Sequence, residues 1–398
     1  MSDLFHAELQ QLRANSLHRK LREIGTAQAP EVQIVGERLI NFSSNDYLGL
    51  ANDALLRDAT TAAIAEFGVG SGASRLVSGT LSPHVRLETA LAKWKGTQAA
   101  LTFTSGYAAA LGTLQAVAGK HDIVLLDKLA HASLIDGAKL SGATIRVFPH
   151  NHLGKLESLL ESARREHPDS KVIIATESVF SVDGDRTPLR ELVSLKKRFG
   201  ALLLLDEAHA VGVIGANGRG LAADEGLTRH IDIQIGTMSK ALGVSGGYVC
   251  GSRGVIEWLI NRARSFIFTS APPPALAAAA TAAIEFLASD RGEECRLLLW
   301  QRIAMLRSAL DGGGQGETEA VQSGSAIHPI AVGDEVEAVE LSRALQAEGF
   351  LVPAIRYPTV AKGAARLRIT VTAAHSEGQI RGLAESLKRL RPELTLAA

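Results

Sequence analysis

The side chains best suited to chemistry directly follow two apolar segments. Lys240 lies in the run GTMSKALG, which comes after the apolar segment 231–235. Asp206 follows the apolar segment 201–205 and opens the run DEAH. A lysine amine can form an imine with a carbonyl group, and a carboxylate can hold a protonated pyridine nitrogen. An enzyme that uses pyridoxal phosphate (PLP) needs these two groups from its protein.

Each of these side chains, taken alone, has a simpler interpretation. A lysine in a loop is usually a solvated charge, although the small and apolar neighbours of Lys240 favour close packing, which lowers the pKa of an amine. Asp206 and Glu207 could instead hold a metal or cap a helix. A metal site would require more ligands, and His209 alone is close in sequence, so we expect no metal.

Two further segments offer groups that a flat, phosphorylated cofactor could use. In the run TSGY, Ser105 follows the predicted strand 99–104 and precedes a predicted helix, whose first N–H groups can bind a phosphate. A plain serine cap is an equally good interpretation of this run. Thr237 could add a hydroxyl group. His131 follows the segment 122–126 and could stack on a ring, although a lone histidine is more often structural.

Competing motifs are weaker. The run GVGSGA at 68–73 partly matches a dinucleotide-binding fingerprint, but no predicted strand precedes it. Thr237 and Lys240 have the spacing of an acyl-enzyme motif only with threonine in place of serine, and the companion motifs are absent. We therefore set both aside.

Seven apolar segments, separated by helical patterns, position these side chains. Continuous apolar runs of this length predict a mainly parallel seven-stranded sheet covered on both faces, an α/β architecture that binds ligands at the carboxyl ends of its strands. The predicted strands span residues 99–104, 122–126, 144–148, 171–176, 201–205, 231–235 and 246–250.

Outside the sheet, the patterns predict helices, a loop and a last strand. Residues 5–24 have the pattern of an amphipathic helix, and Pro83–Lys95 that of a helix capped by Ser82. The glycine-rich stretch 311–325 predicts an exposed loop, and the alternation in 365–372 predicts a half-buried strand of a smaller α+β domain. We expect an arm at 1–45, a large domain at 46–285 and the smaller domain at 286–398.

The composition is that of an ordinary soluble protein. The chain has 398 residues, with 42 basic and 42 acidic side chains, so no net basic field favours nucleic acid or a membrane. Cys250 and Cys295 are the only cysteines, as expected in a reducing cytoplasm. The first residues do not form a signal peptide, and the alanine-rich run 271–288 is too weakly apolar to span a bilayer.

Several longer motifs occur in an order that resembles the α-oxoamine synthases, PLP enzymes of fold type I. The similarity covers residues 13–375 and rests on NFSSNDYLGL, GSGASRLVSGT, FTSGYAAALG, DKLAHAS, ESVFSVDGD, LLLDEAHAVGVIGANGRG and GTMSKALG. Several motifs of this length in the same order are highly specific.

The resemblance implies a role for each candidate residue. Lys240 carries the cofactor as an imine, Asp206 faces the pyridine nitrogen and His131 stacks on the ring. Further cofactor positions are Gly106, Tyr107, Ser181, His209 and Thr237. Arg368 binds the amino acid's carboxylate, and Arg19 and Thr359 bind the acyl substrate. Asn45 lies near the site.

The resemblance also implies a reaction, a decarboxylative condensation of an amino acid with an acyl thioester. Within the family, the segments 41–50, 74–80 and 356–375 are most similar to the biotin-pathway branch, which joins L-alanine to pimeloyl-CoA or a pimeloyl carrier protein. Branches that use glycine or serine, such as glycine C-acetyltransferase, 5-aminolevulinate synthase and serine palmitoyltransferase, remain alternatives, as do an aminotransferase and a silent partner subunit. We expect a cytoplasmic homodimer with its sites at the subunit interface.

Overall fold

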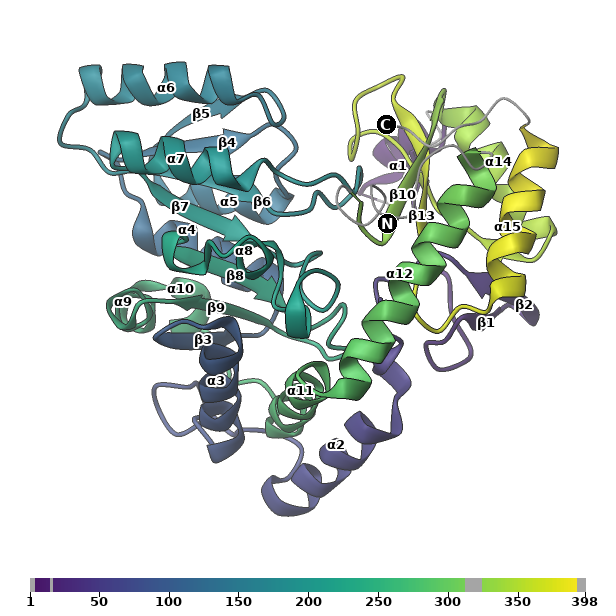
Figure 1. Cartoon of the computed structure of the whole chain (residues 1–398), viewed down its shortest axis with the longest axis horizontal. Coiled ribbons are helices and arrows are strands. Elements are labelled where there is room, and N and C mark those ends of the chain that lie inside the picture. The colour runs from purple at the N-terminus through teal and green to yellow at the C-terminus, as the bar shows by residue number, and fades with distance from the viewer. Residues whose placement is uncertain (1–3, 15–16, 312–323, 392–398) are drawn as a thin grey trace. The chain divides into compact units, whose positions relative to one another are not determined.

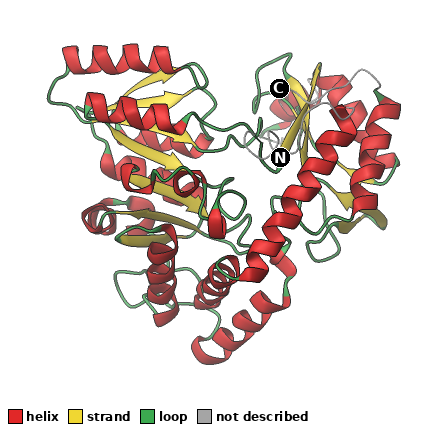
Figure 2. Cartoon of the chain, in the orientation of Figure 1, coloured by secondary structure: helices red, strands yellow, loops and turns green. Residues whose placement is uncertain are grey.

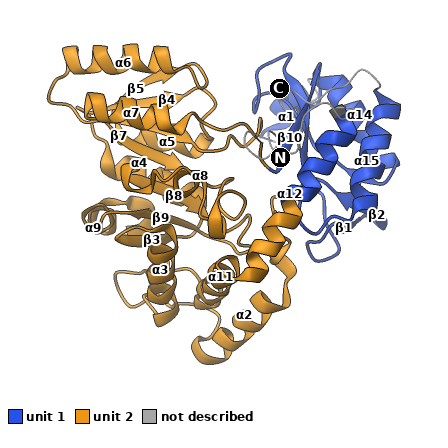
Figure 3. Cartoon of the chain, in the orientation of Figure 1, with its two compact units in different colours: residues 1–44, 300–322, 326–398 blue, residues 45–299, 323–325 orange. Residues whose placement is uncertain are grey.

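In the computed structural model, the chain forms two compact units (Figure 3). The structure describes residues 4–14, 17–311 and 324–391. Most of the loop predicted at 311–325 therefore lies outside the described residues. The first unit comprises residues 1–44, 300–322 and 326–398, and the second comprises residues 45–299 and 323–325.

The second unit contains the predicted sheet. All seven predicted strands are confirmed to within two residues at each end, and their order is β3-β9-β8-β7-β6-β4-β5 (Figure 1). The strand β9 runs antiparallel to both of its neighbours, and the other pairs are parallel. The bounds are β3 (Ala99–Phe103), β4 (Ile123–Asp127), β5 (Thr144–Phe148), β6 (Val172–Glu177), β7 (Leu202–Asp206), β8 (Ile233–Thr237) and β9 (Gly247–Gly251).

Helices surround this sheet (Figure 2). Their bounds are α2 (Ala54–Phe67), α3 (Ser82–Lys95), α4 (Gly106–Val117), α5 (Ala132–Ser141), α6 (Leu153–Glu166), α7 (Leu189–Phe199), α8 (Leu221–Asp224), α9 (Arg253–Arg262), α10 (Arg264–Ile267) and α11 (Pro274–Leu287). Short 3₁₀ turns lie at η1 (Leu50–Asn52), η2 (Ala216–Gly218) and η3 (Thr228–His230).

Both faces of the sheet are buried, which explains why the strands are continuous apolar runs. Leu204 belongs to the core that α4, α5, α9 and α10 form with one face. Successive side chains of a strand point to opposite faces, so Leu203 and Leu205 face the other side, and they are also fully buried. A Cβ on Gly137 of α5 would lie only 3.0 Å from Leu114 of α4, so α5 packs closely on α4.

The predicted helix over Pro83–Lys95 is confirmed, but its predicted cap is wrong. Ser82 is the first residue of α3, and Leu81 occupies the capping position. The side chain that forms a hydrogen bond at the helix start is that of His84, whose Nδ1 accepts from the Leu81 N–H at 3.1 Å. Because a histidine three residues into the helix satisfies this N–H group, no serine cap is required.

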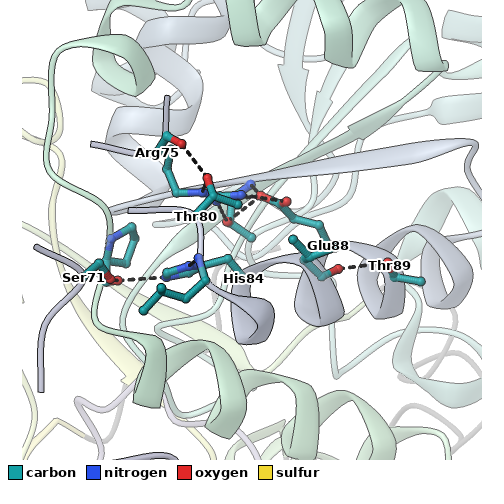
Figure 4. A network of polar contacts seen from close by, with 10 residues as sticks. Ser71, Arg75, Thr80, His84, Glu88 and Thr89 are labelled. Carbon is teal, nitrogen blue, oxygen red and sulfur yellow. Dashed lines mark hydrogen bonds and ion pairs between the residues drawn. The ribbon is translucent and has the colours of Figure 1, made fainter. Parts of the chain in front are cut away.

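A buried ion pair fastens the segment 71–80 to α3 and β3 (Figure 4). Arg75 forms a two-pronged pair with Glu88, at 2.9 and 3.0 Å, and its Nε donates to Thr80 at 3.0 Å. Glu88 also accepts from the N–H and hydroxyl groups of Thr102 on β3. This bidentate arrangement satisfies the buried charges and holds the segment against the edge strand of the sheet.

The first unit is an α+β fold with two small sheets. One sheet has the order β1-β2-β11 and the other β10-β13-β12. The strands are β1 (Glu31–Ile34), β2 (Glu37–Asn41), β10 (Ile327–Gly333), β11 (Phe350–Leu351), β12 (Ala354–Ile355) and β13 (Ala365–Thr370). The helices are α1 (His6–Ala14), α14 (Glu335–Ala347) and α15 (Glu377–Leu390), with α12 (Asp290–Asp311) crossing from the second unit into the first.

Two expectations for this unit need correction. The helix predicted over 5–24 is shorter, since α1 ends at Ala14, and residues 17–23 form no helix. None of the residues of α1 is buried, so no tertiary packing supports a longer helix. The strand predicted over 365–372 forms as β13, but it is not half-buried. Its polar side, with Arg368 and Thr370, is buried as well.

Candidate active site

Four polar residues end four neighbouring strands of the large sheet. Asp127, Glu177, Asp206 and Thr237 are the last residues of β4, β6, β7 and β8, which are consecutive in the sheet. Glu177 lies directly opposite Asp206 in the register of β6 and β7. Parallel strands bring these ends to one edge, where ligands bind in open α/β sheets.

Lys240 belongs to a hydrogen-bonded chain at this edge. Its Nζ lies 2.8 Å from Nε2 of His209, whose Nδ1 lies 2.5 Å from the hydroxyl of Tyr47. An ammonium group can only donate, so Nε2 accepts from Lys240 and Nδ1 carries the ring proton toward Tyr47. His209 and Tyr47 are buried. The imidazole therefore orients the lysine amine and can accept a proton from it.

Asp206 is a buried carboxylate that favours a positive partner. Its Oδ1 accepts a hydrogen bond from the Ala208 N–H at 2.9 Å. Burial raises the pKa of Asp206, whereas the charge on Lys240, the Ala208 N–H and His131 oppose that rise. Loss of hydration disfavours the ionised form, so a cation placed at this carboxylate stabilises it. A protonated pyridine nitrogen is such a cation.

His131 caps α5 and presents an exposed ring to the site. Its Nδ1 accepts from the Ser133 N–H at 3.2 Å, so the ring proton of the neutral form lies on Nε2. Partial burial lowers the pKa of His131, opposed by the charge on Asp206. Nearby, the Tyr107 hydroxyl donates to Asp136 at 2.6 Å, and the tyrosine itself stays 46% exposed. Two flat side chains are thus available to a ligand ring.

A cradle for an anion lies where α4 begins. Ser105 caps the helix by accepting from the Ala108 N–H, as the alternative interpretation of this run expects. The cap leaves the first N–H groups of the helix, on Gly106 and Tyr107, for another acceptor. A Cβ on Gly106 would lie 3.1 Å from Thr237, so the backbone approaches β8 closely.

These groups fit PLP. The N-terminus of the 12-residue α4, with the Thr237 hydroxyl beside it, suits a phosphate. Buried Asp206 suits the pyridine nitrogen, exposed His131 suits a ring face, and Lys240 supplies the amine. None of the described residues forms a cluster of three or more metal ligands. The groups at this edge suit an organic phosphate with a cationic nitrogen.

The remaining predicted residues are divided between the units. Ser181, in the loop after β6, and Asn45 belong to the second unit, and both are half-buried. Arg19, Thr359 and Arg368 belong to the first unit. Arg19 and Thr359 are exposed, whereas Arg368 is buried and donates from Nη1 to the Thr370 hydroxyl at 2.9 Å.

Sequence reasoning missed three side chains at this edge. Tyr47 was one, although it lies in the NDYLGL run that the resemblance includes. Glu177 ends a strand as Asp206 does, but that position by itself assigns it no role. Lys95 is fully buried and pairs with Glu207, with nothing in its surface-like helical context to indicate burial.

A second histidine clamps the loop that carries Ser181. His150 Nδ1 lies 3.0 Å from Asp127, and its Nε2 lies 2.8 Å from Asp185. Burial lowers the pKa of His150, but the two carboxylates outweigh it and raise the pKa to about 10. The imidazolium ion thus joins the end of β4 to the loop 178–187.

We expect His150→Gln to destabilise the protein at pH 7, by about 1–3 kcal/mol, because the buried carboxylate of Asp127 loses its charged hydrogen bond. The folded-state pKa lies above the ordinary 6.5, so the stabilisation is complete below pH 6.5 and is lost as the pH rises through about 10. The Tm gap between wild type and variant should therefore close near pH 10. The exposed His167→Gln is the control. A gap that widened with pH would contradict the clamp.

Comparisons with known proteins agree with this geometry. A sequence profile described as aminotransferase class I and II matches residues 37–387. The 8-amino-7-oxononanoate synthase of Geobacter sulfurreducens is 45% identical over 387 residues, with 97% of each chain covered. That of Anaeromyxobacter sp. is 44% identical, covering 98% of this chain and 96% of the relative.

Solved structures show the same fold. Serine palmitoyltransferase from S. paucimobilis, with a bound PLP–myriocin aldimine, has a TM-score of 0.88 and 32% identity, with 98% of each chain covered. The 8-amino-7-oxononanoate synthase from Francisella tularensis has a TM-score of 0.74 and 29% identity, covering 89% of this chain and 98% of the other. The fold and the family resemblance are thereby confirmed. The chain belongs to the class I and II aminotransferase family and, within it, to the 8-amino-7-oxononanoate synthases.

Proposed function

We propose that this protein uses PLP to condense L-alanine with a pimeloyl thioester, releasing carbon dioxide and the free thiol and forming 8-amino-7-oxononanoate. The observation that carries the proposal is the edge of the sheet where Lys240, hydrogen-bonded to His209, and buried Asp206 lie beside the start of α4. Relatives that are 45% identical along nearly the whole chain carry the name of this activity. Serine palmitoyltransferases, at 32–33% identity, represent the alternative branch.

The bound PLP supplies an electron sink for the negative charge that forms at the amino acid's Cα. Lys240 holds the cofactor, and its Nζ then removes and returns the Cα proton as a general base and acid. His209 Nε2, 2.8 Å from Nζ, keeps the amine oriented during both transfers. Asp206 keeps a proton on the pyridine nitrogen. Arg368 is proposed to bind the amino acid's carboxylate with its planar fork.

Release of free thiol from pimeloyl-CoA, measured with each candidate amino acid, tests the proposal. We expect alanine to be the preferred amino acid and carbon dioxide to be formed in step with the thiol. An aminotransferase would convert a keto acid without releasing any thiol. Preference for palmitoyl-, acetyl- or succinyl-CoA, or for serine or glycine, would move the chain to another branch. No turnover at all with PLP bound would favour a silent partner.

We expect Arg19→Ala to weaken the use of pimeloyl-CoA more than that of an uncharged acyl-CoA of equal length. The exposed Arg19 is the proposed partner of the far carboxylate of the pimeloyl chain. Losing one charge-assisted contact, worth about 1.5–3 kcal/mol, should lower kcat/KM for pimeloyl-CoA by roughly 10- to 100-fold. Arg57→Ala, on an exposed position of α2, is the control. Equal losses for both acyl chains would remove Arg19 from this role.

We also propose that the protein is a homodimer in the cytoplasm, as closed two-fold assemblies are the commonest. The segment 266–270 is the proposed cross-subunit element. Within it, Phe268 is 70% exposed in the single chain, whereas Phe266 packs on Phe103. Both cysteines are free, as in a reducing compartment. Among the described residues, no helix has the length and apolar character to cross a membrane. Light scattering at assay concentration should give twice the chain mass, and an active monomer would refute the dimer.

A further inference from the structure

The proposed reaction leaves one buried acid at the sheet edge without a task. Glu177 is 2% exposed, and its Oε1 has no hydrogen-bond partner among the described residues. A buried ionised carboxylate normally has both oxygens satisfied by donors or a cation. The unpaired oxygen therefore requires either a ligand or a proton.

The neighbouring buried acids at the same edge have cationic partners. Asp127 is paired with the His150 imidazole, and Glu207 is paired with Lys95. Glu177 and Asp206, which lie opposite each other in the strand register, face the charge of one lysine, Lys240. Neighbouring strands are about 4.8 Å apart, so two full negative charges here would repel each other strongly.

The contacts of Glu177 connect two parts of the site. Its carboxyl group accepts a hydrogen bond from the backbone N–H of His131, the residue that caps α5. Its strand neighbour is Asp206. Glu177 thus lies between the ring-stacking candidate and the carboxylate proposed to hold the pyridine nitrogen. The charge of the Glu177 side chain therefore affects both His131 and Asp206.

We propose that Glu177 is a positioning residue of the cofactor site, a neutral carboxylic acid that shares one proton with Asp206 and leaves the pair a single negative charge for the ligand's cationic nitrogen. If both acids were ionised, two negative charges would face the single positive charge of a pyridinium ion. If both were protonated, no negative charge would remain to bind that ion. The inference rests on the proposed function only for the identity of that cation.

The electrostatics of the surroundings agree with a proton on Glu177. Burial raises its pKa well above the ordinary value, and the charge on Asp206 raises it further. Lys240 and the His131 N–H act in the opposite direction, and Asp127 adds to the rise. The charged groups that face Glu177 thus come from β7, β4 and the segment after β8, and the start of α5 contributes a backbone N–H.

Infrared spectroscopy of the apoprotein at pH 7 tests the proton directly. We expect a carbonyl band of a protonated carboxyl group that shifts when glutamate carboxyls carry ¹³C and disappears in Glu177→Gln. The control Glu66→Gln, at an exposed position of α2, should keep the band. No band, or a band that shifts only with labelled aspartate, would overturn the proposal. The isotope measurement uses the wild-type chain, so it decides the question even if the variant does not fold.

Cofactor affinity gives a second readout. Glutamine is a neutral isostere of a protonated glutamate, so Glu177→Gln should bind PLP within about threefold of wild type, measured by fluorescence quenching. If Glu177 were an anion, its loss beside a pyridinium would change the affinity more than tenfold, and that result would overturn the proposal. Both readouts are independent of thiol release. Failure of the thiol assay with the band present would reject the condensation, not the role of Glu177.

Discussion

Lys240→Ala is expected to abolish turnover, lowering kcat by more than about 10³-fold. The substitution removes the amine that holds the cofactor and the group that moves the Cα proton, and a general base alone contributes about 10²–10⁴-fold. His209 loses the partner of its Nε2 at 2.8 Å but keeps the hydrogen bond between its Nδ1 and Tyr47, so the fold should persist. The measurement is thiol release from pimeloyl-CoA together with the absorbance of the bound cofactor.

A covalent map makes this prediction sharper. Borohydride reduction of the wild-type holoenzyme, followed by peptide mass spectrometry, should locate the cofactor on Lys240. The control is Lys93→Ala, at an exposed position of α3, which should behave as wild type in both assays. An adduct on another lysine, or a Lys240→Ala enzyme within tenfold of wild type, would reject the assignment.

Asp206→Asn should lower both PLP affinity and kcat by roughly 10- to 100-fold. A hydrogen bond to a charged group contributes about 1.5–3 kcal/mol, which corresponds to this range of rates. The asparagine can still accept from the Ala208 N–H, so the turn after β7 should keep its conformation. What is lost is the negative charge that keeps the pyridine nitrogen protonated.

The pH dependence distinguishes this loss from a folding defect. An uncharged residue at position 206 lets the ring nitrogen deprotonate, so the defect should increase as the pH rises and the Tm should stay close to wild type. Asp58→Asn, at an exposed position of α2, is the matched control. Activity within a few-fold of wild type would mean that another group holds the ring nitrogen.

The sheet was predictable because its signals are local. Each strand is a continuous apolar run bounded by turns or helices, and burial on both faces requires such a run, as Leu203 to Leu205 illustrate. The polar residues that interrupt these runs lie at their carboxyl ends. This is why Asp206 and Thr237 could be singled out before the sheet order was known.

The arrangement of these ends was decided by the tertiary structure. Strand order is set by how helices and strands pack, so sequence alone could not place Glu177 opposite Asp206 or give β9 its antiparallel direction. Tyr47 meets His209 across 162 residues, a contact without any local pattern. The same holds for Lys95, which has the sequence context of a surface lysine.

The sequence by itself determined which residue types stand at the strand ends and, through its ordered motifs, the family. Tertiary structure alone decided which of these side chains pair with an opposite charge and which lie beside a like charge. Lys95 is buried because Glu207 ends up against the end of α3, and Glu177 is left with an unpaired oxygen because its neighbour across the strands is another acid. The physical reason is that charge pairing depends on distances of a few ångströms between segments far apart in the chain, and packing fixes those distances.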